Sequence, residues 1–380
     1  MTINIYDTRL MIAALEKIPQ PKRFLKDTFF ANEQRSTAEH IDFDVKKFGR
    51  TISPFVSDKK GTSAVERPGF DFRSFVPPTT GAHTVTTAAD VLKRGFGANV
   101  YSNETPTQRS AKIMQSDFMM LNRMIARREE WMIARLMCTG KIIMQGDGVY
   151  QELDLSKFWN LEDISDTDQS FDDENSDIIG FLDDAYAEFM RRSGGLVPDR
   201  IVLGHTAARK IRNNKRWQDE QKYFKTELGQ WTPRWSQKGV KLVGLYMGME
   251  LYEYLEWFLD DLDTDSEGNS IEKLMVDDNV MLMSSSEAIT EFAYGAIYLN
   301  RQNGIFALPR VPHYWSDNNP AVDYLQLQSR PVPIPKDIDA FMTIKVCKSQ
   351  LDIVKKEVKS SVKKHHKKGG TNGTTFLLSN

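Results

Sequence analysis

The sequence predicts an α+β protein in which extended elements surround one long helix and a compact α/β region. Three observations carry this prediction. One apolar stripe runs through residues 104–138, residues 55–100 alternate apolar and polar side chains between turn signals, and residues 196–300 alternate strand-like and helix-like stretches. No internal repeat relates these regions, so each is expected to have a structure of its own.

The long helix has clear start and stop signals. Thr105 suits the N-cap, Pro106 suits the first helical position, and Gln108 completes a capping box. Gly140 is expected to end the helix. At 1.5 Å per residue such a helix is about 50 Å long, a spine with no helix of comparable length to pair with. Its core stripe consists of Met114, Phe118, Leu121, Ile125, Met132 and Leu136.

The regions before this helix are rich in aromatic residues. Residues 1–54 have little globular character, and two interpretations stay open: an arm that packs on a neighbouring subunit, or an edge of the same domain. In residues 55–100, Phe70, Phe72 and Val76 with Val85 beyond predict the two strands of a long hairpin. Such a hairpin is marginally stable alone and needs support from elsewhere.

The regions after the helix predict hairpins and an α/β layer. Residues 141–155 read as a hairpin turning at 146–148, and Ser176 is expected to cap a helix that ends at Gly194-Gly195. The stretch DRIVLG reads as a buried strand, followed by a helix capped by Thr206. Further strands are expected within residues 239–258, 273–286 and 330–346.

Composition limits the class of protein. Hydrophobic residues make up 40% of the 380 residues and charged residues 27%, and no apolar run is long enough to span a bilayer. We therefore expect a protein without membrane contact, made and kept inside a cell. The two cysteines exclude a disulfide framework, and no HExxH, GxSxG or Walker-type motif is present. The sequence gives no catalytic residues and no cofactor.

Charge is distributed unevenly along the chain. The formal net charge is −2, but residues 345–368 hold nine lysines against Asp352 and Glu357, a charge of +7 that leaves −9 for the rest. An acidic body does not fit a dedicated nucleic-acid reader, whose folded surface should be basic. The tail itself stays open to three interpretations: a disordered segment, a contact with packaged DNA or another virion component, or a short amphipathic helix docked on a neighbour.

Several stretches, in order along the chain, resemble the lambda-type phage major capsid protein family, which has the Hong Kong 97 capsid fold. They are LMIAALEKI and RFLKDTFF in the arm, ISPFVS, FVPPTTGAHTV, the spine-helix block ETPTQRSAKIM to GKIIMQG, RIVLGHTAARKIR, and SRPVPIPKDIDAFMTIKV. The resemblance covers about residues 1–346. The chain departs from the family beyond that point, where the basic tail continues.

The resemblance implies an assembly role. The chain would be the head protein of a tailed bacteriophage, forming pentamers and hexamers of an icosahedral shell around double-stranded DNA. Scaffold, portal and decoration proteins would be further partners, with assembly in the host cytoplasm and a final location in the virion. The implied inter-subunit contacts are Phe29, Phe30, Phe70, Phe72, Phe75 and Val76. The implied division is an N-terminal arm (1–54), an extended loop (55–100), the spine helix with a peripheral domain (101–195), an axial domain (196–300), a return to the peripheral domain (301–346) and a basic tail (347–380).

The alternative function is a calcium- or metal-dependent enzyme or binding protein. It rests on the acidic segment 261–272, where the candidate ligands are Asp261, Asp263, Asp265 and Glu272. Against it, Ser266 stands where a calcium loop needs glycine, and the flanking residues are strand-like instead of helical. The strand-like flanks instead predict a hairpin with its turn at residues 266–269.

Overall fold

The computed structural model describes residues 11–12, 21, 23–46, 52, 55, 70–92, 105–146, 148–167, 169–173, 176–227, 239–264, 269–299, 304–318 and 321–349. The greater part of the predicted basic tail, residues 350–380, therefore lies outside the described residues, as do residues 56–69 of the predicted extended loop.

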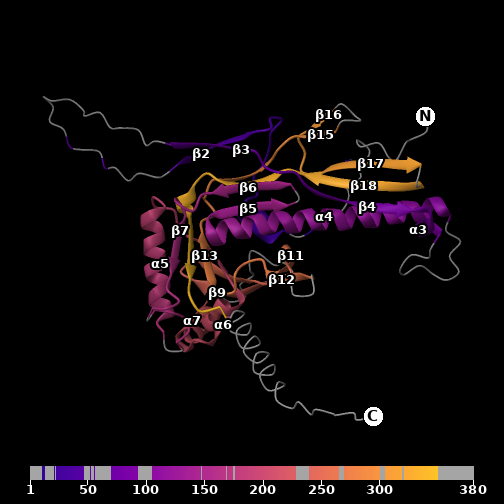
Figure 1. Cartoon of the computed structure of the whole chain (residues 1–380). Coiled ribbons are helices and arrows are strands. Elements are labelled where there is room, and N and C mark those ends of the chain that lie inside the picture. Colours follow the sequence, from indigo (N-terminus) through magenta and orange to yellow (C-terminus); the bar gives the residue numbers. More distant parts are fainter. Residues whose placement is uncertain are drawn as a thin grey trace, which may run out of the picture.

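A single long helix, α4 (Pro106–Thr139), runs through the molecule and connects its two halves (Figure 1). The predicted capping box is present: Gln108 N–H donates to Thr105 Oγ1 at 3.3 Å, and Thr105 N–H donates to Gln108 Oε1 at 3.0 Å. Gly140 closes the helix with a φ of 69°, a left-handed conformation that glycine adopts without strain. The prediction of this helix and of both its ends is confirmed.

A three-stranded antiparallel sheet covers the N-terminal half of α4. It has the order β17 (Val311–Asn318), β18 (Ala321–Ser329), β4 (Thr80–Thr87). Leu325 and Leu327 of β18 pack on Phe118 and Leu121 of α4, and this makes a small separate core. Figure 1 shows the strands lying along the helix on one side of it.

The predicted hairpin between residues 70–76 and the strand around Val85 is wrong. Strand β3 (Phe70–Phe75) pairs with β2 (Ile41–Lys46), and β4 pairs with β18. Alternating side chains identify a strand and its buried face, but they do not identify its partner. Two prolines, Pro77 and Pro78, separate β3 from β4 where a hairpin would need a tight turn.

The compact half is an α/β layer around a six-stranded mixed sheet. Its strands, in spatial order, are β7 (Asn160–Asp163), β20 (Phe341–Lys345), β13 (Val280–Ser284), β8 (Arg200–Leu203), β10 (Met249–Tyr254) and β9 (Val240–Tyr246). The helices of this half are α5 (Ile178–Arg192), α6 (His205–Asn213) and α7 (Lys215–Glu227).

Two of the predicted helix caps are shifted by one or two residues. Asp177, and not Ser176, caps α5, and its side chain accepts a hydrogen bond from Gly180 N–H. Gly204, and not Thr206, precedes α6. Thr206 instead donates from its hydroxyl to Asp278 at 2.8 Å. Both corrections arise because several neighbouring residues can cap a helix equally well.

The remaining elements are shorter. They are α2 (Phe24–Phe29), α3 (Ala88–Leu92), the hairpin β5 (Lys141–Gly146) with β6 (Val149–Asp154), the hairpin β11 (Trp257–Thr264) with β12 (Ser270–Leu274), the pair β15 (Ile297–Leu299) with β16 (Gly304–Phe306), and the sheet β1 (Glu33–Arg35), β14 (Thr290–Tyr294), β19 (Pro331–Pro335), followed by the short 3-10 turn Ile338–Ala340. The β5–β6 hairpin and its turn agree with the sequence prediction.

Candidate functional site

The spine stripe divides between two cores. Phe118, Leu121 and Ile125 are buried under the three-stranded sheet, with Met114 half-buried beside them. Met132 and Leu136 lie in the main core, together with residues of the arm and of strands β10 and β14. Helix α4 thus contributes side chains to both the main core and the small core under the three-stranded sheet.

The β2–β3 ribbon lies at the edge of the molecule and packs on the main core with one face (Figure 1). Ile41, Phe43 and Val45 on its inner face are buried against the main core. Its outer face exposes Asp42 and Asp44, and Phe72, opposite Asp44, is 59% exposed. Phe72 gives the outer face of this ribbon an exposed apolar side chain.

The predicted inter-subunit residues therefore fall into different environments. Phe72 is exposed, whereas Phe75 and Val76 are half-buried, and the side chain of Phe70 is not among those described. Phe29 and Phe30 are buried in the core of their own chain, at 4% and 0% exposure. Both rings are therefore packed within their own subunit, and their contact with a neighbouring subunit stays a prediction.

A buried carboxylate of the spine helix holds the arm in place. Glu130 accepts hydrogen bonds from the N–H groups of Leu25 (3.0 Å) and Lys26 (2.8 Å) in the first turn of α2, and from the Tyr254 hydroxyl (3.0 Å). It caps α2 from another element, because Arg23 at the N-cap position has no capping side-chain bond. Burial raises the pKa of Glu130 to about 7, although all three hydrogen bonds act in the opposite direction.

The adjacent carboxylate, Glu129, is fully ion-paired. Arg310 donates to both of its oxygens, at 2.6 and 3.0 Å, and also to Asn122 Oδ1 at 2.8 Å. Burial opposes the ionisation of Glu129, but Arg310 with Lys26 and Arg23 outweighs this effect and lowers its pKa. The Tyr294 hydroxyl donates to Glu129 and lies 2.6 Å from Lys26 Nζ.

We name these residues the arm junction: Arg23, Lys26, Glu129, Glu130, Tyr254, Tyr294 and Arg310. The sequence prediction missed it. A signal was present, because the apolar stripe skips one turn between Ile125 and Met132, and the skipped turn carries Glu129 four residues after Ile125. A charged residue on the buried face of a helix is expected to have buried partners.

The acidic segment 261–272 belongs to a hairpin, as expected, and the calcium alternative is not supported. Strands β11 and β12 pair antiparallel on both sides of residues 265–268, so strands stand where an EF-hand has helices. Lys273 Nζ lies 2.9 Å from the carboxylate of Asp263 and 2.7 Å from that of Asp260. The Lys273 ammonium thus already pairs with the carboxylates of Asp260 and Asp263. Candidate Asp265 lies outside the described residues.

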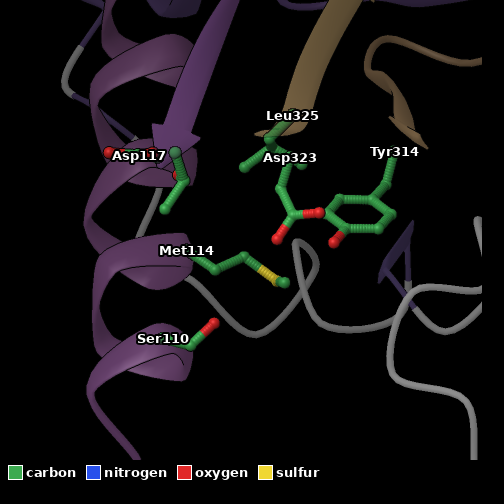
Figure 2. Close-up of a pocket in the computed structure, with 7 residues that line it drawn as sticks. Ser110, Met114, Asp117, Tyr314, Asp323 and Leu325 are labelled. Atoms are coloured by element: carbon green, nitrogen blue, oxygen red, sulfur yellow. The ribbon is translucent and has the colours of Figure 1, made fainter. Parts of the chain in front are cut away.

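Two hollows are present beside α4. The first, shown in Figure 2, lies between α4 and the three-stranded sheet; Met114 and Asp117 reach it from the helix and Asp323 from β18. Its volume of about 20 Å³ accommodates roughly one water molecule. The second is larger, about 280 Å³, and is lined by Arg128 and Trp131 of α4, by Ile143 and Val149 of the β5–β6 hairpin, and by Pro78.

Nothing in the described part of the chain groups three or more histidine, cysteine or carboxylate side chains around a point where a metal ion could bind. Among the same residues, no helix is long and apolar enough to cross a membrane. The features suited to contact with another molecule are surfaces. They are the exposed side of the β2–β3 ribbon, the side of α4 that exposes Arg123 and Arg127, and the larger hollow.

Comparison with known proteins agrees with this picture. The family model of phage major capsid protein E matches residues 7–346. A structure described as a capsid protein of a prophage of E. coli CFT073 is 20% identical, with 90% of this chain and 99% of that chain covered and a TM-score of 0.66. A phage-related protein from Bordetella bronchiseptica RB50 is 11% identical, with 89% and 96% covered and a TM-score of 0.50. Comparison with curated proteins found no match.

The prophage structure shares the fold over almost its full length. The resemblance stated from the sequence is confirmed, and with it the Hong Kong 97 capsid fold and the role of a phage shell protein. The chain belongs to the phage major capsid protein E family.

Proposed function

We propose that copies of this chain assemble as pentamers and hexamers into an icosahedral shell around double-stranded DNA, a structural and non-catalytic role. The observation that carries this proposal is the β2–β3 ribbon, which packs on the main core with one face and exposes Phe72 on the other. A two-stranded ribbon is marginally stable alone. Its outer face gains a packing partner when it lies over the next copy in a ring, and many such contacts act together in a closed shell.

Strand pairing supports a revised division of the chain. The arm would comprise α2 and β1, and the extended loop would run from β2 to β3. The peripheral domain would hold α4, the β5–β6 hairpin and the three-stranded sheet. The axial domain would be the six-stranded sheet with α5, α6 and α7, which includes β7 and β20. Residues 160–192 and 341–345 would therefore belong to the axial and not to the peripheral domain, because they pair or pack in that sheet.

The basic tail is the segment of the chain suited to packaged DNA. Residues 345–368 carry +7 against −9 for the rest of the chain, and phosphate contacts by lysine need no folded reading surface. Scaffold, portal and decoration proteins complete the proposed set of partners, with assembly in the host cytoplasm and the shell in the virion.

Size-exclusion chromatography and negative-stain microscopy of the full chain test the proposal. We expect rings or shells from the wild type, and a strong loss of both from Phe72→Ser. The matched control is Val85→Ser, because Val85 is also exposed but lies on β4, outside the ribbon. A wild-type chain that stays monomeric under all assembly conditions, with or without a scaffold, would refute the shell function. Equal assembly by Phe72→Ser and the control would refute the role of the ribbon.

A further inference from the structure

The spine helix carries a second apolar stripe that the described residues leave exposed. Ile113, Met120 and Met124 follow one another at spacings of seven and four residues, so they share one side of α4. Met120 and Met124 are 46% and 48% exposed, while Phe118, Leu121 and Ile125 on the other side are buried. We name Ile113, Met120 and Met124 the methionine face.

Basic residues flank the methionine face. Between residues 106 and 128 the helix has five basic side chains, Arg109, Lys112, Arg123, Arg127 and Arg128, and one acidic side chain, Asp117. Arg123 and Arg127 are exposed and each follows a methionine by three residues, so both lie beside the face. Asp117 instead faces the small hollow under the three-stranded sheet (Figure 2). This basic surface belongs to a chain whose net charge, without residues 345–368, is −9.

The larger hollow continues the methionine face. Trp131 comes seven residues after Met124 and therefore lies on the same side of α4. It lines the hollow of about 280 Å³ together with Ile143 and Val149. The Arg128 guanidinium lies 5.1 Å from the centre of the Trp131 ring and adds positive charge at the rim. An open apolar stripe thus leads into a hollow that can receive a bulky side chain.

We propose that the methionine face docks an amphipathic helix with acidic flanks, supplied by a different protein that acts with the shell subunit. Methionine side chains adapt to a partner's shape and recur on surfaces that receive helices. Arg123 and Arg127 select a partner with glutamate or aspartate beside its apolar seam. A bulky apolar residue of the partner enters the hollow beside Trp131.

The pattern favours a helix over nucleic acid. DNA would pair its phosphates with the arginines and leave Met120 and Met124 in water. A helix with an apolar seam covers the methionines and pairs with the arginines at once. The proposal goes beyond shell formation, because it concerns a face that is open in the single subunit.

The test uses the full chain and a synthetic helical peptide of about 20 residues with a leucine seam and glutamate flanks, long enough to hold a helix on binding. Fluorescence anisotropy measures its affinity for the wild type, for Met120→Ser/Met124→Ser and for Arg123→Glu/Arg127→Glu. We expect each double variant to lose about tenfold or more in affinity. Val85→Ser, an exposed apolar residue on β4, is the matched control and should bind as the wild type does.

A charge-swapped peptide with lysine flanks sharpens the test. It should bind the wild type poorly and regain affinity for Arg123→Glu/Arg127→Glu, a recovery that a misfolded variant would not give. Peptide affinity that is equal in all variants would overturn the proposal. So would short duplex DNA that binds in place of the peptide and is unaffected by the methionine substitutions, or subunits that associate through this face without peptide. A chain that forms shells but binds no peptide would leave the shell function standing.

Discussion

Replacing Glu130 by glutamine probes how the arm is held to the spine helix. The Glu130 carboxylate is buried and accepts three hydrogen bonds, two of them from the first turn of α2. Glutamine has the same shape and keeps one carbonyl acceptor, but it does not titrate. The variant therefore separates the effect of the ionising group from the effect of the hydrogen bonds.

The raised pKa of Glu130 fixes the sign and size of the expected effect. Burial is the largest cause of the rise from 4.5 to about 7. Between these values the folded chain keeps a proton that the unfolded chain has released, so the contribution of Glu130 is full below the lower pKa and is lost as pH rises to about 7. The difference between these two pKa values corresponds to about 3 kcal/mol of unfolding free energy.

Urea denaturation of unassembled subunits between about pH 5 and pH 8 measures this contribution. We expect the unfolding free energy of the wild type, relative to that of Glu130→Gln, to fall as pH rises. The protection of the Leu25 and Lys26 amides, corrected for the intrinsic rise of exchange with pH, should fall over the same range in the wild type alone, because only the wild type loses this contribution to stability. A difference between the two proteins that stays constant with pH would refute the reasoning.

Glu129→Gln is the matched control, since it alters the adjacent residue in the same junction. The pKa of Glu129 is lowered, because Arg310, Lys26 and Arg23 together outweigh the effect of burial. Its contribution is therefore present above the ordinary carboxyl pKa and is lost as pH falls. Glutamine leaves the buried Arg310 guanidinium without its carboxylate, at a cost of about 3–5 kcal/mol near neutral pH. Identical pH profiles for the two variants would contradict the assigned roles.

Four further predictions concern the spine helix and the acidic hairpin. Thr105→Ala removes the capping box and should cost about 1 kcal/mol, measured by chemical denaturation. Gly140→Ala forces a left-handed residue to place its Cβ 2.7 Å from that of Trp159, so we expect a loss of at least about 1–2 kcal/mol. Leu121→Ala, at 1% exposure, should cost about 2–5 kcal/mol. Calcium should leave the wild-type melting temperature unchanged but raise that of Lys273→Met, in which Asp260 and Asp263 lose their cation; a calcium response in the wild type alone would contradict this.

The sequence predicted best what depends on neighbouring residues. The spine helix was placed with both its caps because the stripe, the capping box and the closing glycine all lie within one continuous segment. The β5–β6 and β11–β12 hairpins were also placed, since each joins strands that follow directly in the chain. The caps of α5 and α6 were misplaced by one or two residues, because neighbouring polar and small residues compete for that position.

Contacts between distant segments were not predicted. Strand β4 pairs with β18, more than 200 residues later in the chain, and no local pattern specifies that partner. The burial of Phe29 and Phe30 depends on Phe341, whose ring is 6.2 Å from that of Phe30, and on other residues of the main core. The larger hollow likewise forms only when four separate segments of the chain come together.

The arm junction illustrates why a buried ionic cluster suits this position. Apolar side chains of the same size would stabilise the fold at least as well, because the desolvation of buried charges offsets much of their attraction. The ionic cluster instead fixes the orientation of the arm relative to the spine helix. Arg310 meets Glu129 through two parallel hydrogen bonds that fix one relative orientation, and Glu130 accepts from two N–H groups in the first turn of α2 and from the Tyr254 hydroxyl. The arm that leads into the β2–β3 ribbon is therefore anchored in one orientation. In the proposed shell, this fixed orientation would let every copy present its ribbon to the next one in the same way.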